Sequence, residues 1–233
     1  MLAVELKTGT KRSHTAAENT KFVGSFLRGV VSEENYRTLI KDFYFVYSAI
    51  EEEMERLEDN EYIAPINFKE LKRVEQLKMD VRYYYGPNWR GIIQPSESAI
   101  QYVERIHEVA EDNPKLLIGH HYTRYMGDLS GGVILGNITK NALKLKDKGL
   151  AFYDFPEITD KKGFKDSYRS VLDNFLPVDQ QDVNAIIVEA NYAFRLNMYM
   201  FEEIQGDATK GFISYACGYA TSRLSYFFKV AGG

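Results

Sequence analysis

Residues 35–57 read NYRTLIKDFYFVYSAIEEEMERL, and their apolar side chains recur at steps of three and four. That period is typical of an α-helix with one buried face. A second stripe of the same period spans residues 183–204. Start signals precede both stripes: Ser32 stands before two glutamates, and Asp179 lies three residues before Asp182. The sequence therefore predicts two long amphipathic helices.

The rest of the chain also favours helices. Alternating strand patterns are nearly absent, apart from an ambiguous stretch at residues 90–93. Further helix starts are predicted at Pro95-Ser96, Asn113-Pro114 and Thr159-Asp160. Breakers fall at residues 86–88, 147–156 and 176–177. We expect an all-α fold of seven or eight helices, with residues 1–233 as one domain and residues 206–233 as its C-terminal tail.

Composition excludes several classes of protein. The 233 residues are 45% hydrophobic and 27% charged, which is typical of a globular chain. A single cysteine, Cys217, excludes a disulfide framework and a thiolate-held metal cluster. The net charge of −4 argues against nucleic-acid binding, and no apolar run is long enough to span a membrane. The start of the chain lacks a signal peptide, so we expect a cytoplasmic protein or one of the plastid stroma.

Charge is unevenly distributed along the chain. Residues 51–61 form an acidic run, and Arg12 is one of several basic residues near the start. The second half carries further basic residues, among them Lys140, Lys144, Lys146, Lys148, Lys161 and Lys162. Solvated helix faces explain all of these, but converging basic groups would also hold carboxylates or dock an acidic protein. The aromatic-rich segment after Gly206 is either a terminal helix packed on the domain or a membrane contact.

The four histidines do not have the spacing of a zinc site. Glu104 and His107 match one half of a di-iron site, but no second copy of that unit is present. His14 and Glu18 are four apart, so they share one face of a helix. From the residues alone, His14 is either an ordinary helical histidine or an axial ligand of a porphyrin iron, with Glu18 orienting its ring.

Residues 120–132, HHYTRYMGDLSGG, are the most unusual stretch. Glycine costs about 1 kcal/mol at an interior helix position relative to alanine, so three within six residues need a reason. Gly127 and Gly131 share a face and leave either a bare groove for a flat ligand or a close crossing of two helices. The cluster also predicts a kink. Asp128 lies beside the groove, where it either organises water or faces solvent.

Four motifs, in the expected order, resemble those of the haem oxygenase family. They are KRSHTAAEN at residues 11–19, YTRYMGDLSGG at 122–132, FKDSYR at 164–169 and AFRLNMYMFEE at 193–203. The resemblance extends from about Leu6 to about Ile204. The chain is most similar to the soluble biliverdin-forming enzymes of cyanobacteria and algal plastids.

The resemblance implies an all-α bundle that holds haem between a proximal helix and a kinked distal helix. It implies oxidative opening of haem b at the α-meso carbon to biliverdin IXα, carbon monoxide and ferrous iron. Haem is then both substrate and cofactor, dioxygen is consumed, and electrons come from an external donor. Ferredoxin is the expected donor, and a bilin reductase of phycobilin synthesis is a further expected partner. Neither a nucleic acid nor a membrane is expected as a partner.

Site roles follow from the same motifs. By resemblance, His14 is the proximal ligand of the haem iron, with Glu18 beside it, and the catalytic residues are Gly127, Asp128 and Gly131. The other residues implied to bind haem, several of them at its propionates, are Lys7, Lys11, Tyr122, Lys165, Arg169, Phe194 and Asn197.

Two residues depart from the family pattern. Met126 replaces the usual leucine, which we expect to change packing only slightly. His121 stands where the family usually has a small residue, and we expect it on the distal side or at the surface. The rival interpretations are a haem carrier or sensor without turnover, and a thiaminase-like or di-iron enzyme. The last two would need a nucleophilic cysteine within the motifs or a second carboxylate–histidine unit.

Overall fold

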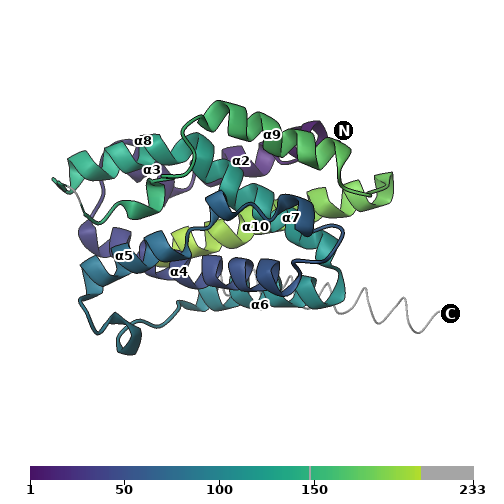
Figure 1. The fold of residues 1–233 in the computed structure, drawn as a ribbon. Helices are drawn as coiled ribbons and strands as arrows, with labels where there is room; N and C mark the ends of the chain where they lie inside the picture. Colours follow the sequence, from purple (N-terminus) through teal and green to yellow (C-terminus); the bar gives the residue numbers. More distant parts are fainter. Residues whose placement is uncertain (147, 206–233) are drawn as a thin grey trace, which may run out of the picture.

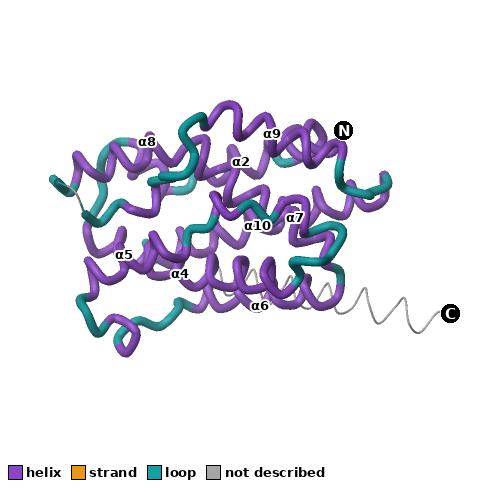
Figure 2. The backbone as a smooth tube through the Cα atoms, viewed as in Figure 1, coloured by secondary structure: helices purple, strands orange, loops and turns teal. Residues whose placement is uncertain are grey.

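The computed structural model describes residues 1–146 and 148–205. The predictions for Cys217 and for the aromatic-rich segment after Gly206 lie outside these residues. All regular structure in the described part is helical (Figures 1 and 2). Its α-helices are α1 (Leu2–Gly9), α2 (Lys11–Glu18), α3 (Lys21–Leu27), α4 (Glu33–Arg56), α5 (Val74–Tyr85), α6 (Glu97–Asp112), α7 (Leu117–His121), α8 (Gly127–Ala142), α9 (Lys161–Asn174) and α10 (Gln180–Ile204).

The all-α fold is confirmed, but the predicted number of helices was too low. Ten α-helices lie within the described residues, because two helical stretches are interrupted. The first 27 residues break at Thr10 and at Thr20 into α1, α2 and α3. A π-helical turn, Tyr122–Met126, separates α7 from α8. Residues 90–93 form no strand, since Trp89–Gly91 is a single 3-10 turn.

Local sequence signals set most helix starts correctly. The Ser32 hydroxyl accepts a hydrogen bond from the Asn35 backbone N–H at 3.1 Å, and Asp179 forms a capping box with Asp182. Ser96 caps α6, and Asp160 caps α9. Asn113 is the exception: Pro114 starts a 3-10 turn there, but the Asn113 side chain makes no capping hydrogen bond. The short polar side chains therefore act as expected wherever they can reach the free N–H groups.

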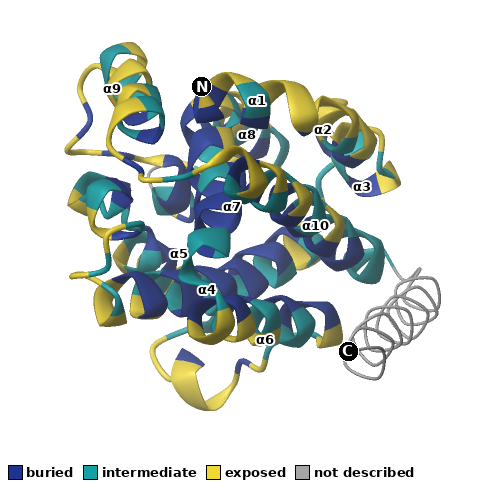
Figure 3. Ribbon diagram, turned by 90° about the vertical axis from the view of Figure 1, so that its right-hand side faces the viewer, coloured by how far each residue is buried: buried dark blue, intermediate teal, exposed yellow. Residues whose placement is uncertain are grey.

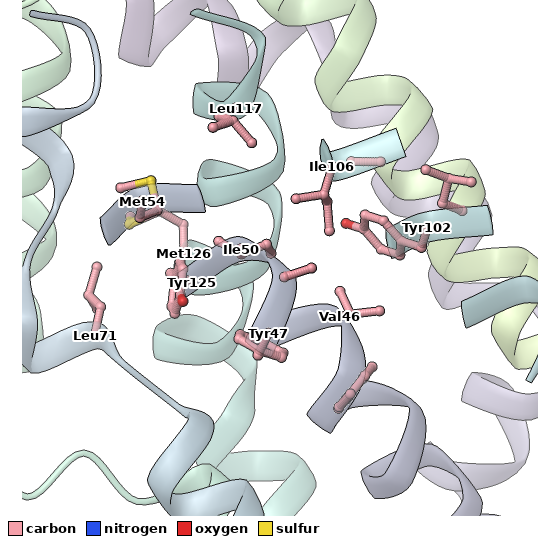
Figure 4. Packing of buried hydrophobic residues seen from close by; sticks show 14 of the residues in the cluster. Val46, Tyr47, Ile50, Met54, Leu71, Tyr102, Ile106, Leu117, Tyr125 and Met126 are labelled. Atoms are coloured by element: carbon pink, nitrogen blue, oxygen red, sulfur yellow. The ribbon is translucent and has the colours of Figure 1, made fainter. Parts of the chain in front are cut away.

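Helix α4 lies at the centre of the hydrophobic core. It packs against α5, α6 and α10, and the stripe predicted from its sequence is buried. Figure 4 shows Tyr47, Ile50 and Met54 of α4 in one cluster with Tyr125 and Met126 of the π turn. The core therefore joins α4 to the segment that leads into α8.

Helices α7 and α10 approach each other closely at Gly119. A Cβ atom at this position would lie 2.8 Å from the Ala190 backbone nitrogen and 3.0 Å from the Ile186 carbonyl oxygen. Next to this crossing, the buried Glu189 of α10 contacts His120 Nε2 at 2.9 Å and accepts two hydrogen bonds from Arg105. Gly119 is therefore required for packing, a role that the sequence pattern did not reveal.

Two members of the acidic run are structural. Glu51 accepts hydrogen bonds from the backbone N–H groups of Arg73 and Val74, so it caps the start of α5. Glu53 is buried and contacts His107 Nδ1 at 2.6 Å. The prediction of a uniformly solvated acidic face was wrong at these two positions, because α4 turns them toward neighbouring elements.

The loop before α9 is fixed beneath α8 by two buried charged residues. Asp80 accepts hydrogen bonds from the backbone N–H groups of Ala151 and Phe152, at 2.9 and 2.8 Å. Arg73 donates to the carbonyl oxygens of Phe152 and Asp154. These contacts hold the adjacent Tyr153 against α8.

In the part of the chain that the structure describes, no helix is both long enough and apolar enough to cross a bilayer.

Both views in Figures 1 and 3 place α2 and α8 on the same side of α10.

Candidate functional site

The glycines of α8 divide between two faces. A Cβ atom added at Gly127 or Gly131 would meet no atom within 4 Å. At Gly136 it would lie 3.1 Å from the Tyr153 ring, and at Gly132 it would lie 3.4 Å from the same ring. Gly127 and Gly131 therefore form the bare groove, and the expected close crossing of two helices is absent at these glycines, because the neighbour at Gly132 and Gly136 is the Tyr153 side chain of a 3-10 turn. Gly132 and Gly136 let a neighbour approach closely, whereas Gly127 and Gly131 leave backbone bare beside open space.

The predicted irregularity of this helix is present, but it precedes the glycines. Residues 122–126 form the π turn, and α8 then continues from Gly127 to Ala142. A π turn places one extra residue in the helix and shifts the direction in which the following side chains point. The position of Asp128 is therefore set by the π turn immediately before it.

Asp128 faces inward, with only 12% of its side chain exposed. Its Oδ2 atom accepts a hydrogen bond from the hydroxyl of Tyr47 on α4. Its Oδ1 atom lies 3.6 Å from Nη2 of Arg124, one turn earlier in the chain. The alternative of a solvent-facing aspartate is excluded, and the carboxylate is held rigidly at the edge of the bare glycine face.

A buried network lies behind Asp128. Arg124 donates from Nε to the Tyr47 hydroxyl at 3.0 Å and from Nη1 to Asn197 Oδ1. Asn197 Nδ2 donates to the Ala193 carbonyl oxygen at 2.8 Å and lies 3.5 Å from the Tyr102 hydroxyl. Asn197 is only 3% exposed, so its place is behind Arg124. This differs from the direct ligand contact that the resemblance implies.

The environment of Asp128 raises the pKa of its carboxyl group. Burial is the largest cause, and Arg124 and the Tyr47 hydrogen bond act in the opposite direction. The group is thus easier to protonate than a surface aspartate, while its position stays fixed. Such a carboxyl group is suited to accepting hydrogen bonds from water and passing protons.

His14 lies on α2 with 57% of its side chain exposed. Its Nδ1 atom lies 3.5 Å from Glu18 Oε2, and its ring packs edge-on against Phe194 of α10, with centroids 5.8 Å apart. Because Glu18 is near Nδ1, Nε2 is the nitrogen available for a metal ion. The accessible imidazole and the bare glycines belong to α2 and α8, two helices on the same side of α10, and each feature fits a flat, metal-containing ligand.

The basic residues implied for the propionates come from three helices. Lys7 and Lys11 are exposed on α1 and α2. On α9, the Arg169 guanidinium donates to Asp166 Oδ1 at 2.6 Å, while Lys165 is half-buried. Burial raises the pKa of Tyr122, and the nearby charge of Arg169 opposes that rise. The charge of Arg169 therefore reaches Tyr122.

The expectation that His121 lies either on the distal side or at the surface is wrong for the surface alternative, because the side chain is buried. It is 2% exposed, and its Nδ1 atom lies 2.8 Å from the Tyr168 hydroxyl on α9. Burial lowers the pKa of His121 to about 3, so the ring is neutral at physiological pH. The side chain fills the interior between α7 and α9, where it contacts Tyr168 and Tyr125.

A di-iron site finds no support in the described residues, where no group of three or more acidic, histidine or cysteine side chains is arranged to hold a metal ion. His107 contacts Glu53 instead, and Arg56 binds the second oxygen of that carboxylate at 2.6 Å.

The fold and site together define an all-α protein with a helical histidine and a bare glycine face backed by a buried aspartate. Residues 1–203 match the sequence profile of the family described as Heme oxygenase. The chain belongs to the haem oxygenase family, whose members are oxidoreductases.

Curated relatives are similar over most of their length. Heme oxygenase 1 of the cyanobacterium Synechocystis is 49% identical over 209 residues, which cover 90% of this chain and 87% of the relative. Heme oxygenase of the red alga Porphyra purpurea is 51% identical over 210 residues, 90% of this chain and 89% of the relative. The crystal structure of Synechocystis heme oxygenase-1 in complex with heme superposes with a TM-score of 0.86 at 46% identity, covering 94% of this chain and 99% of that one.

Sequence reasoning missed Tyr47, Arg124 and Tyr102 as members of the site. Tyr47 was assigned only to the apolar stripe of α4, and Arg124 only to a motif. One signal was available: a buried tyrosine needs a partner for its hydroxyl group, and a buried arginine needs several acceptors. The identity of those partners required the packing of α4 against the π turn.

The two kinds of glycine predict opposite effects on stability. Gly127→Ala in the haem-free protein should raise the free energy of unfolding by about 0.5–1 kcal/mol, because it removes helix-glycine entropy without a clash. Gly119→Ala should lower it by about 1–3 kcal/mol, because its Cβ would overlap the backbone of α10. Urea unfolding of both variants tests this, and a destabilised Gly127→Ala would show that Gly127 packs against protein atoms.

Proposed function

We propose that this protein opens haem b at the α-meso carbon and releases biliverdin IXα, carbon monoxide and ferrous iron. The observation that carries the proposal is the bare backbone at Gly127 and Gly131. The helix keeps two glycines at a cost to its stability, although a Cβ atom at either position would meet no side chain and no other helix among the described residues within 4 Å. A flat ligand lying on this face explains them, and the two Synechocystis heme oxygenase structures were determined in complex with heme.

His14 would bind the iron through Nε2, with Glu18 orienting the ring and Phe194 limiting its rotation. Bound haem supplies both the iron that activates dioxygen and the ring carbon that is oxidised. Asp128 would accept hydrogen bonds from water beside the ring and move protons toward the oxygen. Tyr47 and Arg124 would keep the carboxylate of Asp128 in place, and Asn197 would hold Arg124.

The rotation of the ring would be set at its propionates. Lys165 and Arg169 are one turn apart on α9, and the charge of Arg169 reaches Tyr122. Lys7 lies on α1, and Lys11 lies on α2, the helix that carries His14. Charge-assisted hydrogen bonds from these groups are each worth about 1.5–3 kcal/mol. Several of them acting together would present one meso carbon to the oxygen.

Electrons would come from ferredoxin, an acidic protein, with the product entering phycobilin synthesis in the cytoplasm or plastid stroma. The candidate docking lysines form two groups. Lys140, Lys144, Lys146 and Lys148 lie at the end of α8 and just after it, and Lys161 and Lys162 begin α9. No carboxylate lies within salt-bridge distance of these lysines in the described part of the chain. Their charge is therefore available to attract an anionic partner.

The central test is turnover of bound haem. Haem is titrated anaerobically, oxygen and a reductant are added, and products are separated by chromatography. We expect the haem absorption band to disappear with formation of biliverdin IXα, and His14→Ala to lose most of this product because the iron loses its axial ligand. A stable haem spectrum in the wild type would identify a carrier or sensor instead.

Asp128→Ala should bind haem but form about a hundredfold less biliverdin, since a positioned proton donor contributes at least that factor. Activated oxygen would then be diverted to external phenols, a peroxidase-like activity measured by guaiacol oxidation. Tyr47→Phe should show the same change to a smaller extent, because it frees the carboxylate without removing it. An unchanged biliverdin yield in Asp128→Ala would contradict the proposed role.

Turnover driven by ferredoxin should fall as salt increases, because the Debye length shortens from about 30 Å at 0.01 M to about 10 Å at 0.1 M. Turnover driven by ascorbate should stay level. Replacing Lys144, Lys146 and Lys148 with glutamate, or separately Lys161 and Lys162, identifies which group docks the donor. Equal salt sensitivity with both reductants, or no effect of either replacement, would rule out electrostatic docking at these lysines.

A further inference from the structure

The contact between His121 and Tyr168 is not used by the proposed reaction, although it joins two helices that are. His121 is the last residue of α7, immediately before Tyr122. Tyr168 lies on α9, one turn after Lys165 and immediately before Arg169. The pair therefore connects the backbone beside Tyr122 to the backbone between the two basic residues of α9.

The geometry of this contact is specific. The Tyr168 hydroxyl and His121 Nδ1 are hydrogen-bonded at 2.8 Å, and the two ring planes are within 4° of parallel. Both side chains are almost completely buried. Tyr125 closes the other side of His121, with ring centroids 4.4 Å apart. Because His121 stays neutral at physiological pH, its Nδ1 atom is either the acceptor or the N–H donor of this hydrogen bond, according to the tautomer of the ring.

Helix α9 has few other fixed points. Its backbone packs mainly against α1 and the turn at Ala64–Ile66, and Figure 3 shows it at the periphery with much of its surface exposed. Asp173 Oδ1 accepts a hydrogen bond from the Ala3 backbone N–H at 2.9 Å, which holds the far half of the helix. In the first half, Phe68 packs against the rings of Phe164 and Tyr168. Those apolar contacts restrain α9 without fixing its position along its own axis.

We propose that the His121–Tyr168 hydrogen bond is a positioning contact that fixes α9 relative to Tyr122 and thereby sets the rotation of the bound haem. The inference rests on the proposed function, since it requires haem propionates at Lys165, Arg169 and Tyr122. A charge-assisted hydrogen bond is sensitive to small displacements of its donor. Loosening α9 would thus allow a second ring orientation and expose a second meso carbon to attack.

The test is a double-mutant cycle of Tyr168→Phe, which removes one hydroxyl, and His121→Ser, which introduces a small polar residue. Tyr85→Phe is the matched control. It also removes one tyrosine hydroxyl, which donates to the Arg37 carbonyl oxygen over 3.1 Å, and neither residue belongs to α9. The first readout is amide hydrogen exchange of the haem-free protein. The second is the set of haem methyl proton resonances in the ferric complex, and the third is the biliverdin isomer ratio.

In Tyr168→Phe we expect exchange in α9 to quicken about fivefold, the factor that corresponds to one neutral buried hydrogen bond, with exchange in α10 unchanged. A second set of haem methyl resonances and a second biliverdin isomer should appear. The double variant should match His121→Ser in the exchange rate of α9, in the haem methyl resonances and in the isomer ratio, because both changes break the same contact. Tyr85→Phe should leave all three readouts as in the wild type.

Unchanged exchange in α9 of Tyr168→Phe, or additive effects in the double variant, would overturn the proposal. Faster exchange with a single haem orientation would also overturn it, because α9 would then be loosened without moving the ring. A wild-type protein that binds no haem would contradict the proposed function instead, and exchange in α9 would still decide whether the contact fixes that helix.

Discussion

A buried guanidinium is the constraint on which the rest of the site depends. Arg124 is 7% exposed, and a charge so far from water must be paired and fully hydrogen-bonded. Its partners come from three places in the chain: Tyr47 on α4, Asn197 on α10 and Asp128 on α8. Its flat face also lies 4.3 Å from the centre of the Phe43 ring. The hydrogen bonds and the ion pair of Arg124 therefore fix the positions of α4, α8 and α10 relative to one another.

That constraint explains why the π turn lies where it does. Arg124 is in the middle of the turn, with its side chain directed into the core, and Asp128 follows one turn later at the edge of the open face. The turn allows both side chains to reach Tyr47. Immediately beyond it, α8 is covered on one side by Tyr153 and bare at Gly127 and Gly131 on the other. One helix thus separates a packed interior from a face that carries no side chain at Gly127 and Gly131.

Packing constrains the basic side chains of α9 less than it constrains Arg124. Exposed lysines and arginines pay little for their charge in water, so packing does not determine where they point. Arg169 donates to Asp166 on the same helix, and Lys165 is half-buried. The precision of such groups must come from the helix that carries them. Among the described residues, the buried rings that pack against α9 include His121, which is also hydrogen-bonded to Tyr168 of that helix.

The sequence by itself determined the all-α class and most helix starts. These properties depend on interactions within about four residues, such as capping and the helical period, so they are readable along the chain. Tertiary structure alone decided which glycines are bare, that Glu51 and Glu53 are structural, and that His121 is buried. It also decided that Asp128 meets Tyr47, 81 residues away. Partners so far apart are selected by how whole helices pack, and no local pattern encodes that choice.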